Sequence, residues 1–426
     1  MRVALWLLAI FAAAVGVALF AARSTGSVTL YWPPHRVDLS LNLVLLLLAA
    51  LFVLLHLAIR ALGALADLPS QAKAWRAAQR QQAMHGELRD ALAHLLAGRF
   101  SRAKKQALLA HQHAKALELE PSLRSACLKV QSQSLLIAAE AAQSMQEASD
   151  RERYVQAALQ VPLPKSAAHF KEGATLRSAR WMLDEHDPST SLTRLSTLSQ
   201  GAQRRTLALR LKLRALQLAK QPALALETAR MLAKHGGFSD GAAQSILRSL
   251  AISTLSQAHD ADQLLQAWET LSHEDRSQPQ VATHAALRLV NFSAGLPEAT
   301  ELLERARAWI EPVWQRYPQL PESEQVRVVR ALEASFSPQT ASLDHAWLAK
   351  IETAQRQLPH DARLQYLAGM ACLRRQLWGK SQQMLSSSAA HLGDAQLRRS
   401  AYQSLAQLAE QRGDEAAAVA AWKKAS

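Results

Sequence analysis

Cysteine is scarce in this sequence. The 426 residues include only two cysteines, Cys127 and Cys372, which lie far apart and are not part of any paired motif. Structural zinc sites use closely spaced cysteines and small secreted domains carry several disulfides, so this pattern excludes both kinds of framework. We expect both thiols to be reduced and buried as small apolar groups.

Residues that favour β-sheet are also few. Phe, Tyr and Trp make up 5% of the chain, and Gly and Pro number 15 each. Almost no segment after residue 60 alternates apolar and polar residues with a period of two. Apolar residues recur instead every three or four positions, which is the spacing of one helical face. The sequence therefore predicts an all-α fold for this part of the chain.

Motifs of catalysis are missing as well. Gly379-Lys380-Ser381 resembles the end of a phosphate-binding loop, but Arg374 stands where that loop needs its first glycine. No glycine-rich fingerprint follows a strand, and no His, Cys or carboxylate cluster has metal-ligand spacing. We therefore predict that the protein is not an enzyme, with no catalytic or metal-ligating residues, and no cofactor-binding residue can be named.

Two long apolar runs are present at the start of the chain, at residues 3–22 and 39–59. Each is about 20 residues long, which matches the roughly 30 Å hydrocarbon core of a bilayer for a helix. We expect both to span a membrane, so that residues 1–60 form a transmembrane hairpin. A cleaved signal peptide is the alternative for the first run, because small residues at 18–22 could precede a cleavage site.

Positive charges predict the orientation of this hairpin. Arg2 precedes the first run, and a series of Lys and Arg follows the second, whereas the connecting loop 24–38 carries Arg36 offset by Asp38. The positive-inside rule then places both termini in the cytoplasm and the loop in the periplasm of a bacterial inner membrane. Amphipathic aromatic rings and basic side chains collect at headgroup depth. We expect four such anchors: Tyr31, Trp32, Arg60 and Trp75.

A basic segment follows the second run. We expect Ala61–Leu68 to end at Pro69 and Gln71–Arg99 to form one amphipathic helix, and we assign residues 61–85 to a basic juxtamembrane helix. Residues 61–426 hold 45 basic and 34 acidic side chains, a net charge of +11. Such a surface is attracted to anionic lipid. Because the charges are scattered singly and no binding motif is found, we do not expect nucleic acid to be a partner.

Repeated segments indicate how the rest of the chain is organised. Residues 367–388 and 405–425 show the same order of small and apolar residues, and 91–110 carries a third copy. This order resembles the tetratricopeptide repeat, a pair of antiparallel helices of about 34 residues that stacks on its neighbours. Small residues are expected where the two helices pack closely: Gly98, Ala103, Gly369, Cys372, Ser381, Gly413 and Ala418.

Further hairpins are expected between these copies. We divide the array into helical-hairpin repeats at 86–320 and C-terminal tetratricopeptide repeats at 321–426, with a boundary at the prolines 318 and 321. The number of repeats is left open. The intervening hairpins are placed at Leu123–Leu159, Ala174–Leu198, Arg204–Lys234, Gly241–Leu271, Val281–Arg307 and Ser323–Gln357.

The layout as a whole resembles the HemY family of proteobacterial inner-membrane proteins. The residues that carry the resemblance are Gly26-Ser-Val28-Thr-Leu30, Arg36-Val-Asp38-Leu-Ser40-Leu-Asn42 and Gly98-Arg-Phe100-Ser-Arg-Ala103. The resemblance implies a part in a late step of protohaem synthesis. The flavin-dependent protoporphyrinogen oxidase that shares the name is a different protein, and this chain lacks the dinucleotide-binding glycines of that enzyme.

The resemblance and the repeats together suggest a non-enzymatic scaffold or regulator in a late step of protohaem biosynthesis. Its expected partners are late haem-biosynthesis enzymes and the lipid bilayer. No cofactor is expected as a requirement, although an apolar groove with Arg or Lys at its rim could bind a porphyrin or haem. The alternative is a tetratricopeptide adaptor for envelope assembly, such as those that control lipopolysaccharide synthesis.

Overall fold

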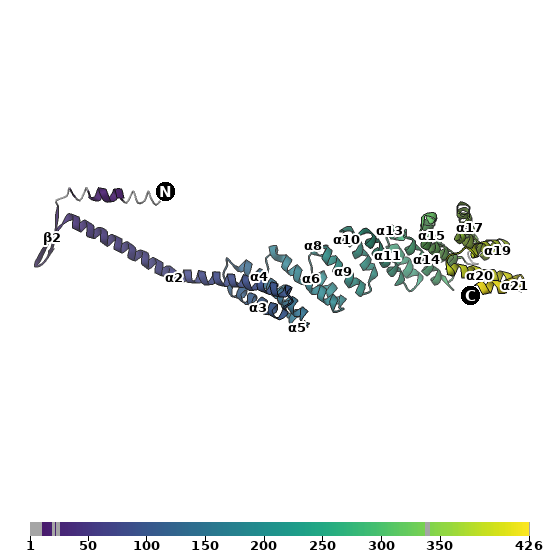
Figure 1. The fold of residues 1–426 in the computed structure, drawn as a ribbon, viewed down its shortest axis with the longest axis horizontal. Helices are drawn as coiled ribbons and strands as arrows, with labels where there is room; N and C mark the ends of the chain where they lie inside the picture. Colours follow the sequence, from purple (N-terminus) through teal and green to yellow (C-terminus); the bar gives the residue numbers. More distant parts are fainter. Residues whose placement is uncertain (1–10, 19–21, 23–25, 337–340, 426) are drawn as a thin grey trace. The chain divides into compact units, whose positions relative to one another are not determined.

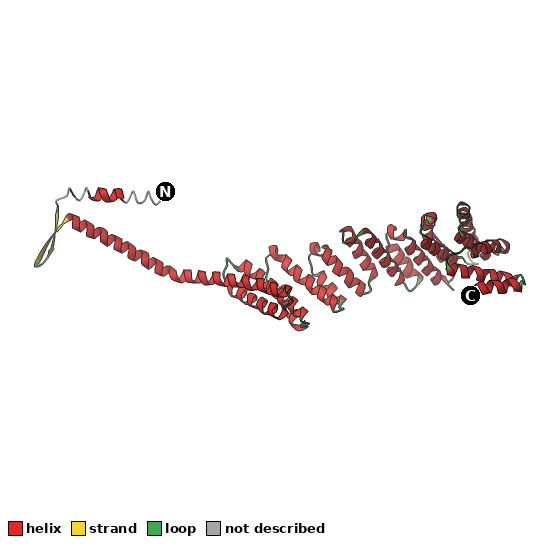
Figure 2. Cartoon of the chain, in the orientation of Figure 1, coloured by secondary structure: helices red, strands yellow, loops and turns green. Residues whose placement is uncertain are grey.

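The computed structural model describes residues 11–18, 22, 26–336 and 341–425, with only the backbone described at 63–71, 73, 74 and 341–344. Most of these residues are helical, and the sheet among them is one two-stranded hairpin (Figure 2). The chain divides into two compact units, Met1–Ala168 and His169–Ser426. The expected boundary between 86–320 and 321–426 stays a prediction.

The first unit begins with an antiparallel β-hairpin that leads directly into a long helix. Ser27 pairs with Ser40 and Trp32 with His35 at the two ends of the hairpin. The long helix then packs against two further helices, and these pack against a fourth. The elements are β1 (Ser27–Trp32), β2 (His35–Ser40), α2 (Leu41–Leu96), α3 (Phe100–Leu117), α4 (Arg124–Ser144), α5 (Ala148–Gln160) and η1 (Lys165–Ala167).

Two expectations for this unit were wrong. Residues 24–38 were expected to be a loop, but most of them form β1 and β2, because apolar and polar side chains alternate along both strands. A helix was expected to end at Pro69, but α2 continues through that residue. A proline inside a helix removes one backbone hydrogen bond, and the Ala- and Leu-rich flanks are strong enough helix formers to compensate.

The first of the two expected membrane spans lies largely outside the described residues. Within 3–22, residues 11–18 form a helix. The second span corresponds to the start of α2, where Leu41–Leu62 is long and apolar enough to cross a membrane. Among the described residues this is the one such helix, so the two-helix transmembrane hairpin stays a prediction.

The second unit consists of antiparallel helices that pack in sequence order (Figure 1). Its elements are α6 (Ala168–Asp184), α7 (Pro188–Ser196), α8 (Gln200–Gln203), α9 (Thr206–Leu218), α10 (Pro222–Lys234), α11 (Asp240–Ser256), α12 (Ala261–Thr270), α13 (His273–Arg276), α14 (Pro279–Ser293), α15 (Ala299–Trp314), η2 (Tyr317–Gln319), α16 (Glu322–Ser335), α17 (Ala341–Gln357), α18 (Ala362–Arg374), α19 (Trp378–Ala389), α20 (Ala395–Gln411) and α21 (Glu415–Ala425). Four of the six intervening hairpins expected from the sequence are confirmed as packed helix pairs: α4–α5, α9–α10, α11–α12 and α14–α15. For the other two, the structure has helices at the expected positions, α6 with α7 and α16 with α17.

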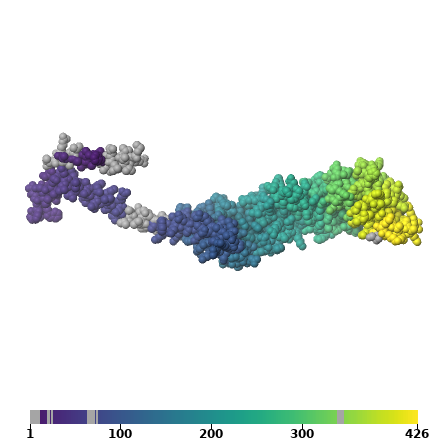
Figure 3. All heavy atoms as spheres, viewed as in Figure 1, coloured from purple at the N-terminus to yellow at the C-terminus, as the bar shows by residue number. Residues whose placement is uncertain are grey.

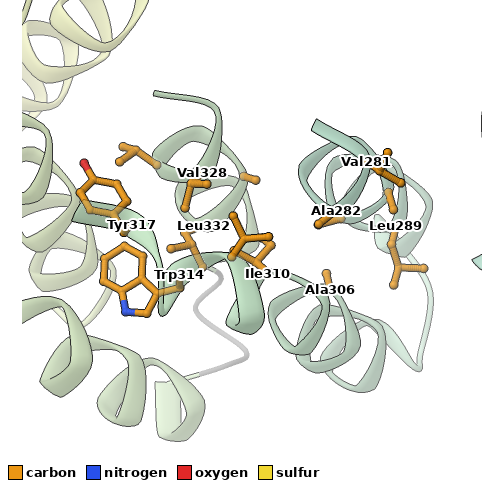
Figure 4. Packing of buried hydrophobic residues seen from close by; sticks show 14 of the residues in the cluster. Val281, Ala282, Leu289, Ala306, Ile310, Trp314, Tyr317, Val328 and Leu332 are labelled. Atoms are coloured by element: carbon orange, nitrogen blue, oxygen red, sulfur yellow. The ribbon is translucent and has the colours of Figure 1, made fainter. Parts of the chain in front are cut away.

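The core of this unit is continuous from one hairpin to the next from α9 onward, and a separate cluster between Ala179 and Ala215 packs α6 to α9. One cluster of buried apolar side chains extends from Leu209 to Leu408. Figure 4 shows its middle part, where side chains of α14, α15 and α16 interdigitate and Tyr317 closes one side. Ala282 and Ala306 are fully buried at the approach of α14 and α15, since only a small side chain fits there. Each hairpin therefore buries its apolar face against its neighbours, as in a helical repeat protein.

Candidate functional site

The apolar part of α2 is the candidate membrane anchor. Leu41–Leu62 contains 22 residues, which is about 33 Å of helix at 1.5 Å per residue. None of these side chains is buried against the rest of the protein (Figure 3). Ser40 caps the helix at its N-terminus, where its Oγ accepts a hydrogen bond from the Leu43 N–H at 3.4 Å.

The two expected anchors at the other end of this segment lie at different depths. Arg60 is exposed and lies two residues before Leu62. Trp75, which is 66% exposed, lies on the same helix 13 residues beyond Leu62, about 20 Å further along the axis. Trp75 can reach the headgroups only where the helix beyond Leu62 follows the membrane surface, so its role as an anchor stays a prediction.

The expected anchors Tyr31 and Trp32 lie on opposite faces of the β-hairpin. They are neighbours on β1, and successive side chains of a strand point to opposite faces. Tyr31 pairs with Arg36, whose guanidinium carbon lies 5.9 Å from the centre of the Tyr31 ring. Trp32 pairs with His35 on the other face. Both rings are 75% exposed, but they cannot enter one interface in the same way.

The residues expected at repeat contacts share a common turn. Six hairpins in the described chain have a left-handed residue between their helices, with φ between +53° and +75°. In each, the N–H of the next residue donates to the carbonyl five positions back, as in a Schellman motif. The six left-handed residues of these hairpins are Gly98, Gln146, His186, Lys220, Gln376 and Gly413, and Gly236 has the same turn between the successive hairpins α9–α10 and α11–α12.

Small buried residues occur at fixed distances from this turn. The residue five positions after the left-handed one is Ala103, Ser381 or Ala418 in the three copies found from the sequence, and all three are buried. Seven positions before Gln376 lies Gly369, where an added Cβ would lie 2.8 Å from Leu385 Cγ. Ser381 Oγ donates to the Gly369 carbonyl at 2.9 Å. The second helix thus approaches the backbone of the first.

The same contact recurs in a hairpin that the sequence motif did not identify. Ser191 Oγ donates to the Ala179 carbonyl at 2.9 Å, and both residues are fully buried. The signal was available in the sequence as an Ala and a Ser twelve positions apart around Asp187-Pro188.

Cys372 lies in the same layer as Gly369 on α18 and is buried, and burial raises the pKa of its thiol.

A groove in the second unit is the candidate partner-binding surface. It has a volume of about 800 Å³ and is lined by α14, α16 and the turn before α20. His284 and Leu287 line one wall and Ser323 the other. Burial lowers the pKa of His284 and the nearby Arg288 lowers it further, so both favour the neutral imidazole. The sequence did not identify this groove, because its walls come from distant segments.

The charges of this groove are largely paired within the protein. Arg330 Nη2 donates to Asp394 Oδ1 at 2.7 Å, and this ion pair joins α16 to the turn before α20. Gln280 Nε2 donates to Glu324 Oε1 at 2.5 Å across α14 and α16. A groove of this size with mixed, internally paired charges fits a segment of a protein partner better than a small ion.

A second cavity of about 310 Å³ lies between α7, α8, α9 and α10. Leu195, Leu209 and Met231 contribute apolar walls, and Arg204 and Lys212 are the charged residues of its lining. Among the described residues neither cation forms an ion pair, and no carboxylate lines the cavity. Such a lining fits a ligand with an apolar body and an acidic group.

The described residues contain no candidate metal-binding site. In that part of the protein, no group of three or more His, Cys, Asp or Glu side chains is arranged to hold a metal ion. Cys127 is buried and free, and burial raises the pKa of its thiol, which makes a reactive thiolate unfavourable.

Two solved structures show a distant likeness to this chain. A chain in the structure of Naa15/Naa10 bound to HypK-THB is 14% identical, with a TM-score of 0.25, over 78% of this chain and 56% of that one. This chain therefore spans just over half the length of that protein. The crystal structure of the P58(IPK) TPR domain is 15% identical, with a TM-score of 0.23, over 77% of this chain and 99% of that one. At these scores the chains do not superpose as a whole.

A comparison with curated proteins gave no significant match. A family match covers the start of the chain, where residues 26–146 fit the family described as HemY protein N-terminus. The matched region begins directly before β1 and ends in the turn between α4 and α5, so it contains the β-hairpin, the apolar segment and the first helical hairpin. Residues 26–146 therefore match the HemY N-terminal family, the family that the segments between Gly26 and Ala103 resemble.

Proposed function

We propose that this protein is a membrane-anchored, non-enzymatic scaffold or regulator that acts in a late step of protohaem biosynthesis through protein-protein contacts of its helical repeats. The observation that carries the proposal is the construction of α2. The apolar segment Leu41–Leu62 and the residues that pack the first repeat, Met84 and Ala91, belong to one helix within the HemY N-terminal domain. One continuous helix therefore carries both the anchor and the first contacts of the repeat array.

Such a construction holds partner proteins at a membrane. Two proteins bound to one tethered scaffold meet at an effective concentration that reaches the millimolar range for short linkers. This is useful when an intermediate is apolar and reactive, as late tetrapyrroles are. The proposed partners are the enzymes of those steps, and the proposed location is a bacterial inner membrane with both termini in the cytoplasm, in line with the Lys and Arg residues that follow the apolar segment.

The cavity around Arg204 and Lys212 adds a second element to the proposal. A porphyrin is an apolar ring with two carboxylate groups, which is the class of ligand that an apolar cavity with unpaired cations favours. At about 310 Å³ the cavity is at the lower end of ligand sites, so it would enclose only part of such a ring. We propose it as an accessory contact and not as a haem-carrying site.

The experiment that tests the proposal is a tetrapyrrole profile of a deletion strain, with porphyrins and haem measured by chromatography. The strain is complemented with the full chain and with a chain that lacks residues 1–71. This cut keeps Ala77, Met84 and Leu88, which contact the core of the first unit. We expect porphyrin to accumulate and haem to fall in the deletion strain, with rescue by the anchored chain only.

A matched pair of variants tests the groove. Ser323 and Thr300 are both exposed and both occupy the second position of a helix, but only Ser323 lines the groove. Ser323→Tyr is expected to weaken rescue, and Thr300→Tyr to leave it unchanged. An unaltered tetrapyrrole profile in the deletion strain would refute the pathway assignment. Full rescue by Ser323→Tyr would exclude the groove as the partner surface.

A further inference from the structure

The β-hairpin before the anchor has one apolar and one polar face. Cross-strand partners share a face, and the register pairs Val28 with Leu39, Leu30 with Val37 and Trp32 with His35. The opposite face carries Ser27, Thr29, Tyr31, Arg36, Asp38 and Ser40. The apolar side chains thus collect on one side of a ribbon only six residues long.

The start of α2 partly covers this apolar face, since Val28 and Leu39 are half-buried, but the rest of the face is exposed. Leu30 is 51% exposed, Val37 48% and Trp32 75%. A two-stranded hairpin is at best marginally stable in water, because two strands cannot bury an apolar face between them. The polar face by contrast has its own contacts in water, since Arg36 Nε lies 3.4 Å from Asp38 Oδ1 and its guanidinium lies over the Tyr31 ring. The two faces of the hairpin therefore suit an interface between an apolar and an aqueous phase.

The hairpin is also fixed to the end of the anchor. Ser40 is the last residue of β2 and the N-cap of α2, so no linker separates the two elements. The Leu41 N–H donates to the Gly26 carbonyl at 2.9 Å, which ties the start of β1 to the first turn of the helix. Where Leu41–Leu62 crosses a bilayer, the hairpin must lie at the headgroups on the side away from the repeats.

We infer that the hairpin rests on the bilayer, with Val28, Leu30, Trp32, Val37 and Leu39 in the interfacial lipid and the Tyr31–Arg36 face in water. The partner is phospholipid, because the apolar face is continuous with an apolar helix of bilayer length. Trp32 then serves as the interfacial aromatic, and Tyr31 does not enter the lipid. This inference rests on the membrane anchoring in the proposed function.

Site-directed spin labelling of the full chain in lipid nanodiscs tests the inference. Cys127 and Cys372 are replaced by Ala, and one nitroxide is placed at position 29, 30, 37 or 38, with position 51 of α2 as the lipid standard. Accessibility to oxygen reports lipid, and accessibility to a water-soluble nickel chelate reports water. We expect the oxygen-to-nickel ratio at 30 and 37 to exceed that at 29 and 38 severalfold, with a period of two along each strand.

The possible outcomes distinguish a failure of the inference about the hairpin from a failure of the membrane anchor. Equal nickel accessibility at all four hairpin positions would place the hairpin in water and overturn the inference while position 51 still reports lipid. Protection of 30 and 37 from both reagents would mean that protein covers the face, which also overturns it. Nickel access at position 51 would refute the anchor itself and the inference with it.

Discussion

Replacing Gln376 with glycine is expected to stabilise the hairpin α18–α19. Gln376 has a φ of +60° in the turn between these helices, and its side chain is exposed. A side chain with a Cβ costs about 1–2 kcal/mol in the left-handed region, whereas glycine adopts it freely. The turn is held by backbone hydrogen bonds, among them the Leu377 N–H to the Cys372 carbonyl at 2.9 Å, which the substitution preserves.

The net gain is smaller than this strain. Glycine also gives the unfolded chain about 0.4–1 kcal/mol more conformational entropy, so the expected stabilisation is about 0.5–1 kcal/mol. Gln383→Gly is the matched control, since Gln383 is exposed within α19, seven residues away. There the same substitution adds only flexibility and is expected to destabilise the helix by about 0.5–1 kcal/mol. The changes in stability caused by the two variants should therefore have opposite signs.

Hydrogen exchange followed by mass spectrometry on the full chain in detergent is the appropriate assay. Repeat proteins open locally, so a single unfolding free energy does not describe them, whereas the exchange of α18–α19 peptides reports this hairpin. We expect protection to rise about 2- to 5-fold in Gln376→Gly and to fall by a similar factor in Gln383→Gly. Equal losses of protection in both variants would refute the argument that the turn stores strain.

Three further predictions follow from buried or charged groups. Gly369→Ala should destabilise α18–α19 by about 1–3 kcal/mol because its Cβ would meet Leu385, whereas Gly173→Ala, with open space around it, should stabilise α6 by up to about 1 kcal/mol; hydrogen exchange of the peptides that contain each site should change in opposite directions. Hydrogen bonds from Ser189 and Thr190 lower the pKa of Asp187 to about 2, so the stability of α7 should fall as pH drops from 3.8 toward 2, and Asp187→Asn should reduce this dependence in hydrogen exchange of α7 peptides. Lys212→Met should weaken binding of the fluorescent apolar anion anilinonaphthalene sulfonate but not of an uncharged analogue, and equal loss of both would exclude the cation as the determinant.

The helical hairpins could be predicted because their signals are local. Asp187 before Pro188 predicts a helix start, and in the structure its Oδ1 accepts the Thr190 N–H at 3.0 Å. Asp394 caps α20 in the same way, with Leu397 as donor at 2.9 Å. The groove had no local signal. Arg330 and Asp394 are 64 positions apart in the chain and meet only because α16 packs beside the last repeats.

The β-hairpin had a signal that a longer pattern obscured. Leu30 and Trp32 alternate with Thr29 and Tyr31, which is the period of a strand. The segment lies between two apolar runs of bilayer length, and its Pro33-Pro34 pair is typical of a loop, so both features favour a loop over a strand. The face of each aromatic ring follows from the cross-strand register, and the register depends on where the turn lies.

The turn between paired helices explains why only three of the six similar hairpins were recognisable from the sequence. In the hairpin α4–α5, Arg151 occupies the position five residues after the left-handed one, which is small in the other copies. Arg151 is 4% exposed, and its guanidinium donates a hydrogen bond to Gln143 at the end of α4. The bonds that hold the turn come from the backbone, so Gln, His or Lys can replace glycine at a modest cost in free energy. Side chains away from the turn are then free to differ between repeats. The cavity around Lys212 is lined by residues of two such hairpins, and none of the left-handed turn residues lines it. Repeats with the same backbone turn can therefore have different surfaces.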